Sequence, residues 1–313
     1  MINRQKIIFM GTPDFAVPSL KALHNSGHEV VLVVTQPDRP RGRGQKVLLS
    51  PVKEAALELG YDIFQPLSVK TPEFYEKAAA LSPDIFVVIA FGHILPKKVL
   101  SIPKKGAINM HASLLPKYRG PAPIQWAIIN MEKETGVTAM MMNEGLDTGD
   151  ILLSAKTEIF SRETSSSLHD RLSLMAGDLL IMTLSGIGTN SIKPVPQDNS
   201  LATYAPLLKK KDGLIDWSKP AKEIEAFIRG MTPWPGAFTF IGRKRLKLFA
   251  SDVVSIDSKE EPGTVTGETR DKLWIATGKN LLSIKEIQEE SGKRLSIKDY
   301  LCGSIISPGT ILG

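Results

Sequence analysis

Ile7-Ile8-Phe9-Met10, Val30-Val31-Leu32-Val33-Val34 and Ile85-Phe86-Val87-Val88-Ile89 are three runs of apolar residues, and they decide the fold. Continuous apolar runs of this kind are typical of strands buried on both faces of a parallel sheet. Two helical stretches lie between them, at 16–23 and at 52–59. Alternation of strands and helices requires right-handed crossovers, so the sequence predicts an α/β fold with a doubly wound, mostly parallel sheet.

The second part of the chain has a different pattern. We expect strands at 107–111 and 137–142 and a long helix near 165–184, after which residues 189–213 lack apolar periodicity. A helix near 221–229 precedes short apolar segments separated by Gly and Pro, at 237–240, 245–254, 263–266, 273–276 and 281–287. Such spacing is typical of a small, OB-like β-barrel. We therefore predict a first domain over 1–188, a linker over 189–213 and a C-terminal β-barrel over 214–313.

Composition agrees with two domains and a weakly basic surface. The chain has 313 residues, 42% of them hydrophobic, which is enough for two packed cores. Lys and Arg (39) exceed Asp and Glu (33) by only six, which excludes a uniform polycation. From Leu208 to the end there are 18 basic and 14 acidic residues, a net charge of +4, which leaves +2 for the larger first part.

Targeting and redox signals are sparse. A single cysteine, Cys302, cannot form an internal disulfide or a thiolate metal site, so we expect a reducing, cytoplasmic setting and no metal. Residues 1–6 lead into the first strand rather than into a signal peptide, and no run of eighteen apolar residues is present. The sequence therefore predicts no membrane anchor.

Polar side chains follow the predicted strand at 107–111. Asn109 and His111 would emerge at its carboxyl end, where open α/β sheets bind ligands, and Asp147-Thr148-Gly149-Asp150 follows 31 residues after Pro116. An amide, an imidazole and a carboxylate are the groups that can stabilise an oxyanion and move a proton during acyl transfer to an amine. The plainer alternative is that Asn109 and His111 cap a strand end and Asp147 begins a turn.

The motif N-M-H-x-S-L-L-P-x-x-x-G at 109–120, with the later D-T-G-D, resembles the 10-formyltetrahydrofolate-dependent formyltransferases, and the similarity extends over the whole chain. Ala112 is a small departure, since glycine is common there. The resemblance implies transfer of the formyl group of 10-formyltetrahydrofolate to the methionine of initiator methionyl-tRNA, for translation initiation. It also implies that Asn109 stabilises the oxyanion, His111 relays the proton and Asp147 orients the imidazole.

The same resemblance assigns folate contacts. They are expected from Ser113, Leu114, Leu115 and Pro116, and from Phe91 and Gly92 at the end of another strand. A nicotinamide cofactor is disfavoured, because the turn at 10–15 lacks G-x-G-x-x-G. Phe15 in that turn is a weak candidate for contact with the methionyl side chain, with core packing as its more ordinary role.

Three basic segments are candidates for RNA contacts. The segment 36–50 is longer than the usual connection of about 2–6 residues and carries Arg39, Arg41, Arg43 and Lys46 against one acidic residue. Charge alone favours a solvated loop, whereas the resemblance implies contact with the acceptor end of initiator tRNA, with Arg43 foremost. Two further patches follow at Lys209, Lys210 and Lys211 and at Arg243, Lys244 and Arg245, the second continued by Lys247.

Two other functions stay open from the sequence. One is a formyltransferase that acts on a small amine, such as a purine ribonucleotide precursor or an amino sugar nucleotide. The other is a non-catalytic RNA-binding module. For the formyltransferase we expect a monomer. The remaining histidines, His24, His28, His93 and His169, are expected to be structural or solvated, although His93 lies where it could line a folate pocket.

Overall fold

The computed structural model describes residues 4–41, 46–266 and 271–313, with the main chain alone at 39–41 and 46–47. The chain divides into two compact units. The first comprises Met1–Gly120, Glu134–Thr157 and His169–Ala205, and the second comprises Pro121–Lys133, Glu158–Leu168 and Pro206–Gly313. Two segments that precede residue 188 thus belong to the second unit, and the boundaries at 188 and 213 stay a prediction.

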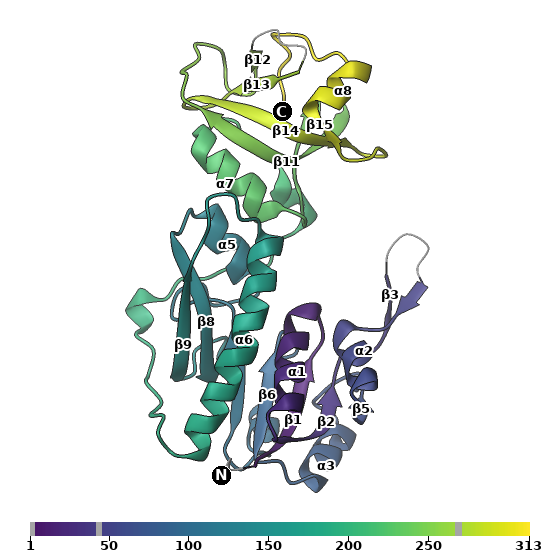
Figure 1. Ribbon diagram of the computed structural model, residues 1–313, viewed down its shortest axis with the longest axis vertical. Coiled ribbons are helices and arrows are strands. Elements are labelled where there is room, and N and C mark those ends of the chain that lie inside the picture. Colours follow the sequence, from purple (N-terminus) through teal and green to yellow (C-terminus); the bar gives the residue numbers. More distant parts are fainter. Residues whose placement is uncertain (1–3, 42–45, 267–270) are drawn as a thin grey trace. The chain divides into compact units, whose positions relative to one another are not determined.

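A seven-stranded sheet forms the centre of the first unit (Figure 1). Its order is β5 (Ile63–Phe64), β2 (Glu29–Val34), β1 (Lys6–Gly11), β6 (Ile85–Ile89), β7 (Ala107–His111), β8 (Glu134–Met141) and β9 (Ile151–Glu158). The pairs from β5 to β7 are parallel, and β8 pairs with β7 in the antiparallel direction. The chain winds outward from β1 to β5 and then outward again from β6, which confirms the doubly wound, mostly parallel sheet.

Helices cover both faces of this sheet because successive strand residues point to opposite sides. Ile8, Met10 and Phe86 pack against α3 (Pro72–Ala80) and α4 (Lys97–Leu100). The helices α1 (Val17–Asn25) and α6 (Ser165–Gly188) lie side by side (Figure 1). A Cβ at Gly177 of α6 would lie only 3.3 Å from the Pro18 carbonyl oxygen of α1, so this glycine permits their close approach.

Helix α6 is long and apolar enough to cross a membrane by length and composition alone, and half of its most apolar window is buried inside the protein. Leu172, Ala176, Leu180 and Leu184 are fully buried at a spacing of four residues. That stripe is typical of a core helix in a folded unit.

The basic segment at 36–50 contains a two-stranded hairpin. In it β3 (Arg39–Arg41) pairs with β4 (Lys46–Leu48) in the antiparallel direction. At its base the Lys53 ammonium donates to the Asp38 carboxylate and to Gln65 Oε1, while Gln65 Nε2 donates to Asp38 Oδ1 at 2.9 Å. These contacts hold the pKa of Asp38 below its usual value, chiefly through the hydrogen bond from Lys53. Helix α2 (Pro51–Glu58), capped by Ser50, follows immediately.

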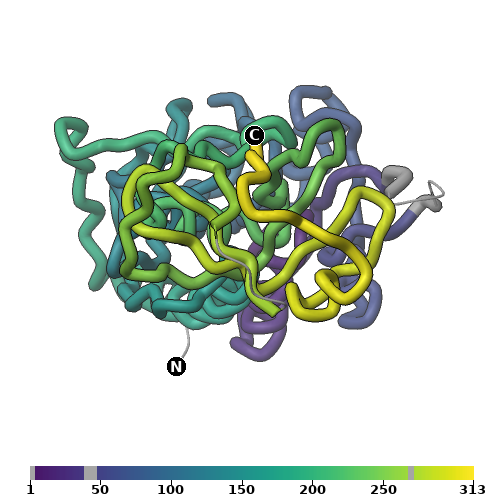
Figure 2. Tube along the Cα trace, turned by 90° about the horizontal axis from the view of Figure 1, so that it is seen from above, coloured from purple at the N-terminus to yellow at the C-terminus, as the bar shows by residue number. Residues whose placement is uncertain are grey.

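The second unit is built on an antiparallel sheet in the order β10 (Ala237–Ile241), β11 (Lys244–Val254), β14 (Leu281–Glu289), β13 (Leu273–Ala276) and β12 (Val265–Thr266), with β15 (Leu295–Ser296) beside β14. The last residues join its two edges. Gly313 N–H donates to the Phe240 carbonyl at 3.1 Å, and Leu312 N–H donates to the Gly263 carbonyl at 2.9 Å. The strands turn back on themselves several times in the green-to-yellow part of Figure 2. This curled, edge-joined sheet confirms the predicted barrel-like architecture.

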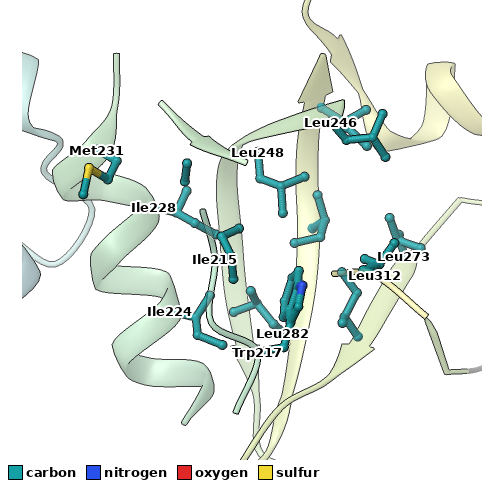
Figure 3. Packing of buried hydrophobic residues seen from close by; sticks show 14 of the residues in the cluster. Ile215, Trp217, Ile224, Ile228, Met231, Leu246, Leu248, Leu273, Leu282 and Leu312 are labelled. Atoms are coloured by element: carbon teal, nitrogen blue, oxygen red, sulfur yellow. The ribbon is translucent and has the colours of Figure 1, made fainter. Parts of the chain in front are cut away.

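The core of the second unit lies between this sheet and helix α7 (Ala221–Met231), as Figure 3 shows. Ile224 and Ile228 point from α7 toward Leu248 and Leu282 of the strands. Trp217, whose Nε1 donates to Thr239 Oγ1 at 3.0 Å, fills the space beside Leu282. Helices α5 (Pro123–Ile129) and α8 (Ile297–Gly303) complete the unit.

Candidate active site

Asn109 and His111 lie two residues apart on β7, and therefore on the same face of the strand at its carboxyl end. Asp147, from the loop between β8 and β9, faces both of them. Its Oδ1 accepts from Asn109 Nδ2 at 3.4 Å, and its Oδ2 lies 3.6 Å from His111 Nδ1. The side chains of His111 and Asp147 are only 7% and 12% exposed, so their interaction is weakly screened by solvent.

The second ring nitrogen of His111 is bound to the main chain. Nε2 lies 2.9 Å from the Tyr118 carbonyl oxygen, which can only accept a hydrogen bond. Nε2 therefore carries the proton, and in the neutral ring Nδ1 presents a lone pair. The nitrogen that can take up a proton is thus the one beside Asp147, where the resulting imidazolium would be stabilised.

Two glycines allow the carboxylate of Asp147 to sit where it does. Gly120 N–H donates to Asp147 Oδ2 at 2.8 Å, and a Cβ at Gly120 would lie 2.7 Å from the Tyr204 ring. A Cβ at Gly149 would lie 1.6 Å from the Met141 carbonyl oxygen. Both positions exclude a side chain, which gives a physical reason for the glycines of the motif.

The loop at 113–116 is held from inside the protein. Ser113 is fully buried and its hydroxyl donates to the Lys117 carbonyl at 2.6 Å, while Thr138 Oγ1 donates to the Ser113 carbonyl at 2.7 Å. Leu115 N–H donates to the same Thr138 Oγ1 at 3.1 Å, and the Leu115 side chain is buried. Leu114 and Pro116 are half-buried, so they present more surface to a ligand than Ser113 does.

The turns after β1, β2 and β6 interlock at the carboxyl edge of the sheet. Gln36 Nε2 donates to the Phe91 carbonyl at 2.9 Å, and Gln36 N–H donates to Thr12 Oγ1 at 3.3 Å. Gly92 has a φ of +79°, and a Cβ there would lie 2.5 Å from Gln36 Nε2. Phe91 is buried in the core, so Gly92 rather than the Phe91 ring offers accessible surface.

The other predicted residues are dispersed. Lys209, Lys210, Lys211, Arg243 and Lys244 are exposed on the second unit. Arg245 is half-buried, and its guanidinium lies 3.9 Å from the centre of the Phe238 ring. The main chain places Arg39 and Arg41 on β3 and Lys46 on β4, whereas Arg43 lies outside the described residues.

The remaining aromatic and histidine candidates have partners within the first unit. Phe15 is buried and packs edge-on against the His169 ring with centroids 5.3 Å apart, which agrees with a packing role. His24 Nδ1 lies 2.8 Å from the Tyr61 hydroxyl, and the His93 ring lies 5.1 Å from that of Phe91. Within residues 4–41, 46–266 and 271–313, no three His, Cys, Asp or Glu side chains gather as metal ligands would.

The sequence pattern did not single out three residues that lie around the site. Tyr118 acts through its carbonyl, Thr138 through a hydroxyl inside a strand, and Gln197 through an amide that donates to the Asp147 and Gly149 carbonyls at 2.9 and 2.7 Å. Gln197 lies in the stretch predicted as a linker. In the sequence it is distinguished only by its place after Pro194 and Pro196 and before Asp198, which is a weak signal.

Comparison with known proteins agrees with this geometry. Residues 5–184 match the formyl transferase family, and residues 207–304 match the formyl transferase C-terminal domain. The chain is 51% identical over 308 residues to a methionyl-tRNA formyltransferase from Citrifermentans bemidjiense, covering 98% of this chain and 96% of the relative. It is 50% identical to the protein of the same name from Alkaliphilus oremlandii, covering 98% and 99%.

Solved structures share the fold at low identity. An N-formyltransferase from Helicobacter canadensis, in complex with folinic acid and dTDP-3-aminofucose, superimposes with a TM-score of 0.65 at 22% identity and covers 91% of this chain and 99% of that one. HypX from Aquifex aeolicus, in complex with tetrahydrofolic acid, gives a TM-score of 0.61 at 19% identity, covering 96% of this chain and 47% of that one. The chain belongs to the formyltransferase family, and within it to the methionyl-tRNA formyltransferases.

Proposed function

We propose that the protein transfers the formyl group of 10-formyltetrahydrofolate to the amino group of methionine on initiator methionyl-tRNA. The observation that carries this proposal is the convergence of Asn109, His111 and Asp147, since His111 Nδ1 and Asn109 Nδ2 lie within 3.6 and 3.4 Å of one carboxylate. Identity near 50% over almost the whole chain with proteins named methionyl-tRNA formyltransferase favours this acceptor.

Each of the three side chains has one task in this reaction. Asn109 donates its amide N–H to the oxygen of the formyl group as negative charge develops there. His111 accepts, at Nδ1, the proton that the methionyl amine loses when its nitrogen bonds to the formyl carbon. His111 then returns this proton to folate N10 as the bond between N10 and the formyl carbon breaks. Asp147 stabilises the intervening imidazolium.

Folate binding is proposed at the loops that surround these residues. Leu114, Pro116 and Gly92 supply half-buried or exposed surface, and Ser113, Leu115 and Phe91 keep the two loops in place from within the core. The mixture of apolar lining and main-chain polar groups suits a flat heterocycle. The reaction as written needs no metal.

The basic residues are proposed as contacts for the tRNA backbone. Arg39, Arg41, Arg43 and Lys46 belong to the sequence segment 36–50, and Lys209, Lys210, Lys211, Arg243, Lys244 and Arg245 belong to the second unit. Cations of this kind neutralise phosphates and thereby orient the RNA without reading its bases. We further propose that the protein works as a monomer in the cytoplasm, with no membrane as a partner.

A direct assay tests the function. The protein is mixed with 10-formyltetrahydrofolate and either methionyl initiator tRNA or small amines of the purine-precursor and amino-sugar-nucleotide classes, and the formylated product is identified by mass spectrometry. We expect formyl-methionine on the tRNA and negligible formylation of the small amines. Preferential formylation of a small amine would favour the first alternative. Binding of tRNA without formylation would favour the non-catalytic RNA-binding module.

A further inference from the structure

We propose that Gln197, held by Arg119, is the positioning residue that sets the catalytic carboxylate of Asp147. The inference rests on the proposed function and adds two residues to it as positioning groups. We call Arg119 and Gln197 together the carboxylate clamp. Every contact that supports it lies within the first unit.

The clamp is required because Asp147 has an unfavourable main-chain conformation. Its φ is +52°, in the left-handed region that residues with a side chain rarely adopt. In this conformation its short side chain faces Asn109, His111 and the Gly120 N–H together. Such a conformation persists where the surroundings hold it, and it recurs at functional sites.

Gln197 holds the loop around Asp147 through hydrogen bonds from its side-chain amide. The two N–H groups of its side-chain amide donate to the carbonyl oxygens of Asp147 at 2.9 Å and of Gly149 at 2.7 Å, on either side of Thr148. One rigid amide therefore spans the part of the loop from which the carboxylate projects. Because Nε2 has only two hydrogens, its donor capacity is used completely by this loop.

Arg119 fixes the amide in turn. Its Nε and Nη2 both donate to Gln197 Oε1, at 3.0 and 2.7 Å, and Nη2 also donates to Asn199 Oδ1 at 2.9 Å. The paired donors of a guanidinium give this contact a defined direction, which a lysine could not provide. The orientation of the amide is thereby settled as well, because its oxygen must face Arg119 and its nitrogen the loop.

The main chain of Arg119 closes the arrangement. Its N–H donates to the Thr203 carbonyl at 2.9 Å, and its carbonyl accepts from Ala205 N–H at 2.7 Å. The next residue, Gly120, donates its N–H to Asp147 Oδ2 at 2.8 Å. Arg119 thus acts on Asp147 in two ways. Through Gln197 it holds the main-chain conformation of Asp147, and through the neighbouring Gly120 it places one hydrogen-bond donor to the Asp147 carboxylate.

The experiment compares Gln197→Glu with the unaltered enzyme. The glutamate keeps the length of the side chain and can still accept from Arg119, but it presents an oxygen to the two loop carbonyls instead of N–H groups. We expect kcat to fall by about 10- to 100-fold, since small misplacements of a catalytic group have effects of that order. The KM for methionyl-tRNA should stay within about twofold, because the side-chain amide is engaged by the loop and by Arg119.

Two controls separate positioning from folding. Gln288→Glu is the matched substitution, because Gln288 Nε2 also donates to a loop carbonyl, that of Gly292 at 2.9 Å, but in the second unit. It should leave kcat unchanged. Gln197→Asn, with a side chain too short to reach both loop and arginine, should lower kcat as Gln197→Glu does. Melting temperatures of all variants identify any that unfold.

A double-mutant cycle tests whether the clamp acts through Asp147. In an Asp147→Asn background, Gln197→Glu should then cause little further loss of kcat. Multiplicative losses, or kcat within about twofold of the unaltered enzyme for both Gln197 variants, would overturn the proposal. An unaltered enzyme that does not formylate methionyl-tRNA would instead overturn the proposed function, so the two failures are distinguishable.

Discussion

Nδ1 of His111 lies 3.6 Å from Oδ2 of Asp147, while the opposite ring nitrogen is bound to a main-chain carbonyl at 2.9 Å. The ring is therefore held through Nε2, with its basic nitrogen toward the carboxylate. A proton taken up at Nδ1 forms a buried ion pair, which makes His111 suited to receiving the amine proton and releasing it again.

Removal of the imidazole should abolish most of the catalysis. His111→Ala is expected to lower kcat by about 10²- to 10⁴-fold, the usual contribution of a positioned acid-base group. Single-turnover formylation of methionyl-tRNA measures this loss, and tRNA affinity measured separately should not change. His24→Ala, at an exposed histidine of α1, is the matched control and should keep full activity. Full activity of His111→Ala would contradict the proposed acid-base role.

Removal of the amide tests stabilisation of the oxyanion. Asn109→Ala should lower kcat by about 10²- to 10³-fold, since loss of one preorganised donor costs about 3–4 kcal/mol in the transition state. Because the donor is needed mainly when negative charge develops, KM for the folate should change much less than kcat. Asn25→Ala, at an exposed asparagine in α1, serves as the control. An effect confined to KM would show that Asn109 binds substrate instead.

The lysines at 209–211 should contribute to tRNA affinity through phosphates. Replacement of all three by glutamine is expected to reduce the slope of log affinity against log salt by about one for each phosphate that is no longer neutralised. Chemistry at saturating tRNA should be unaffected, because a high tRNA concentration offsets a loss of affinity that comes from these exposed side chains. The control replaces Lys21, Lys70 and Lys97, which are exposed on the first unit. An unchanged salt slope would exclude phosphate binding by these lysines.

The C-terminal residues should stabilise the second unit. Leu312 is 3% exposed and packs in the core shown in Figure 3, whereas its neighbour Ile311 is 59% exposed. Leu312→Ala should therefore lower the free energy of unfolding by about 2–5 kcal/mol, because it leaves a cavity. Ile311→Ala should cost far less. Urea titration measures both, and equal losses would argue against the packing of Leu312.

Stability should fall as the pH drops below 6.5, and His28 should contribute to this loss. Burial lowers the pKa of His28 from its usual 6.5, and its Nδ1 accepts from Gln5 N–H at 3.3 Å. The unfolded chain therefore binds a proton at His28 more readily than the folded chain does. The contribution of neutral His28 to the stability of the fold is complete above pH 6.5. It is lost as the pH falls through 6.5 toward the pKa of His28 in the folded protein.

Melting curves at neutral and mildly acidic pH check this sign. The decrease in melting temperature between the two should be smaller for His28→Asn than for the unaltered protein. His24→Asn, at an exposed histidine, should reproduce the unaltered decrease. A decrease of the same size in His28→Asn would show that His28 does not contribute.

Local pattern was sufficient for much of the fold. The apolar runs at 7–10, 30–34 and 85–89 lie in β1, β2 and β6, and the strand expected at 107–111 is β7. Helices α1, α2, α6 and α7 begin and end within a few residues of the predicted stretches. Buried strands and amphipathic helices are readable because their apolar periodicity is a local property of the chain.

Helices and strands without a full apolar pattern could not be predicted from the sequence. Strand β9 mostly alternates half-buried and exposed residues at the edge of the sheet, so it has no continuous apolar run. Helices α4 and α8 span only 4 and 7 residues, too few for a clear period. The hairpin β3–β4 lies in a segment rich in Arg and Gly, where composition favours a loop.

The sequence by itself determined the layered α/β unit, the antiparallel barrel and the identity of Asn109, His111 and Asp147 as candidates. Tertiary structure decided their roles. The Tyr118 carbonyl decides which ring nitrogen of His111 can accept a proton. The conformation of Asp147 depends on hydrogen bonds from Gly120 and Gln197, which lie 27 and 50 residues away in the sequence. Periodicity reports which face of an element is buried, whereas hydrogen bonds between distant loops form only when folding brings their ends together.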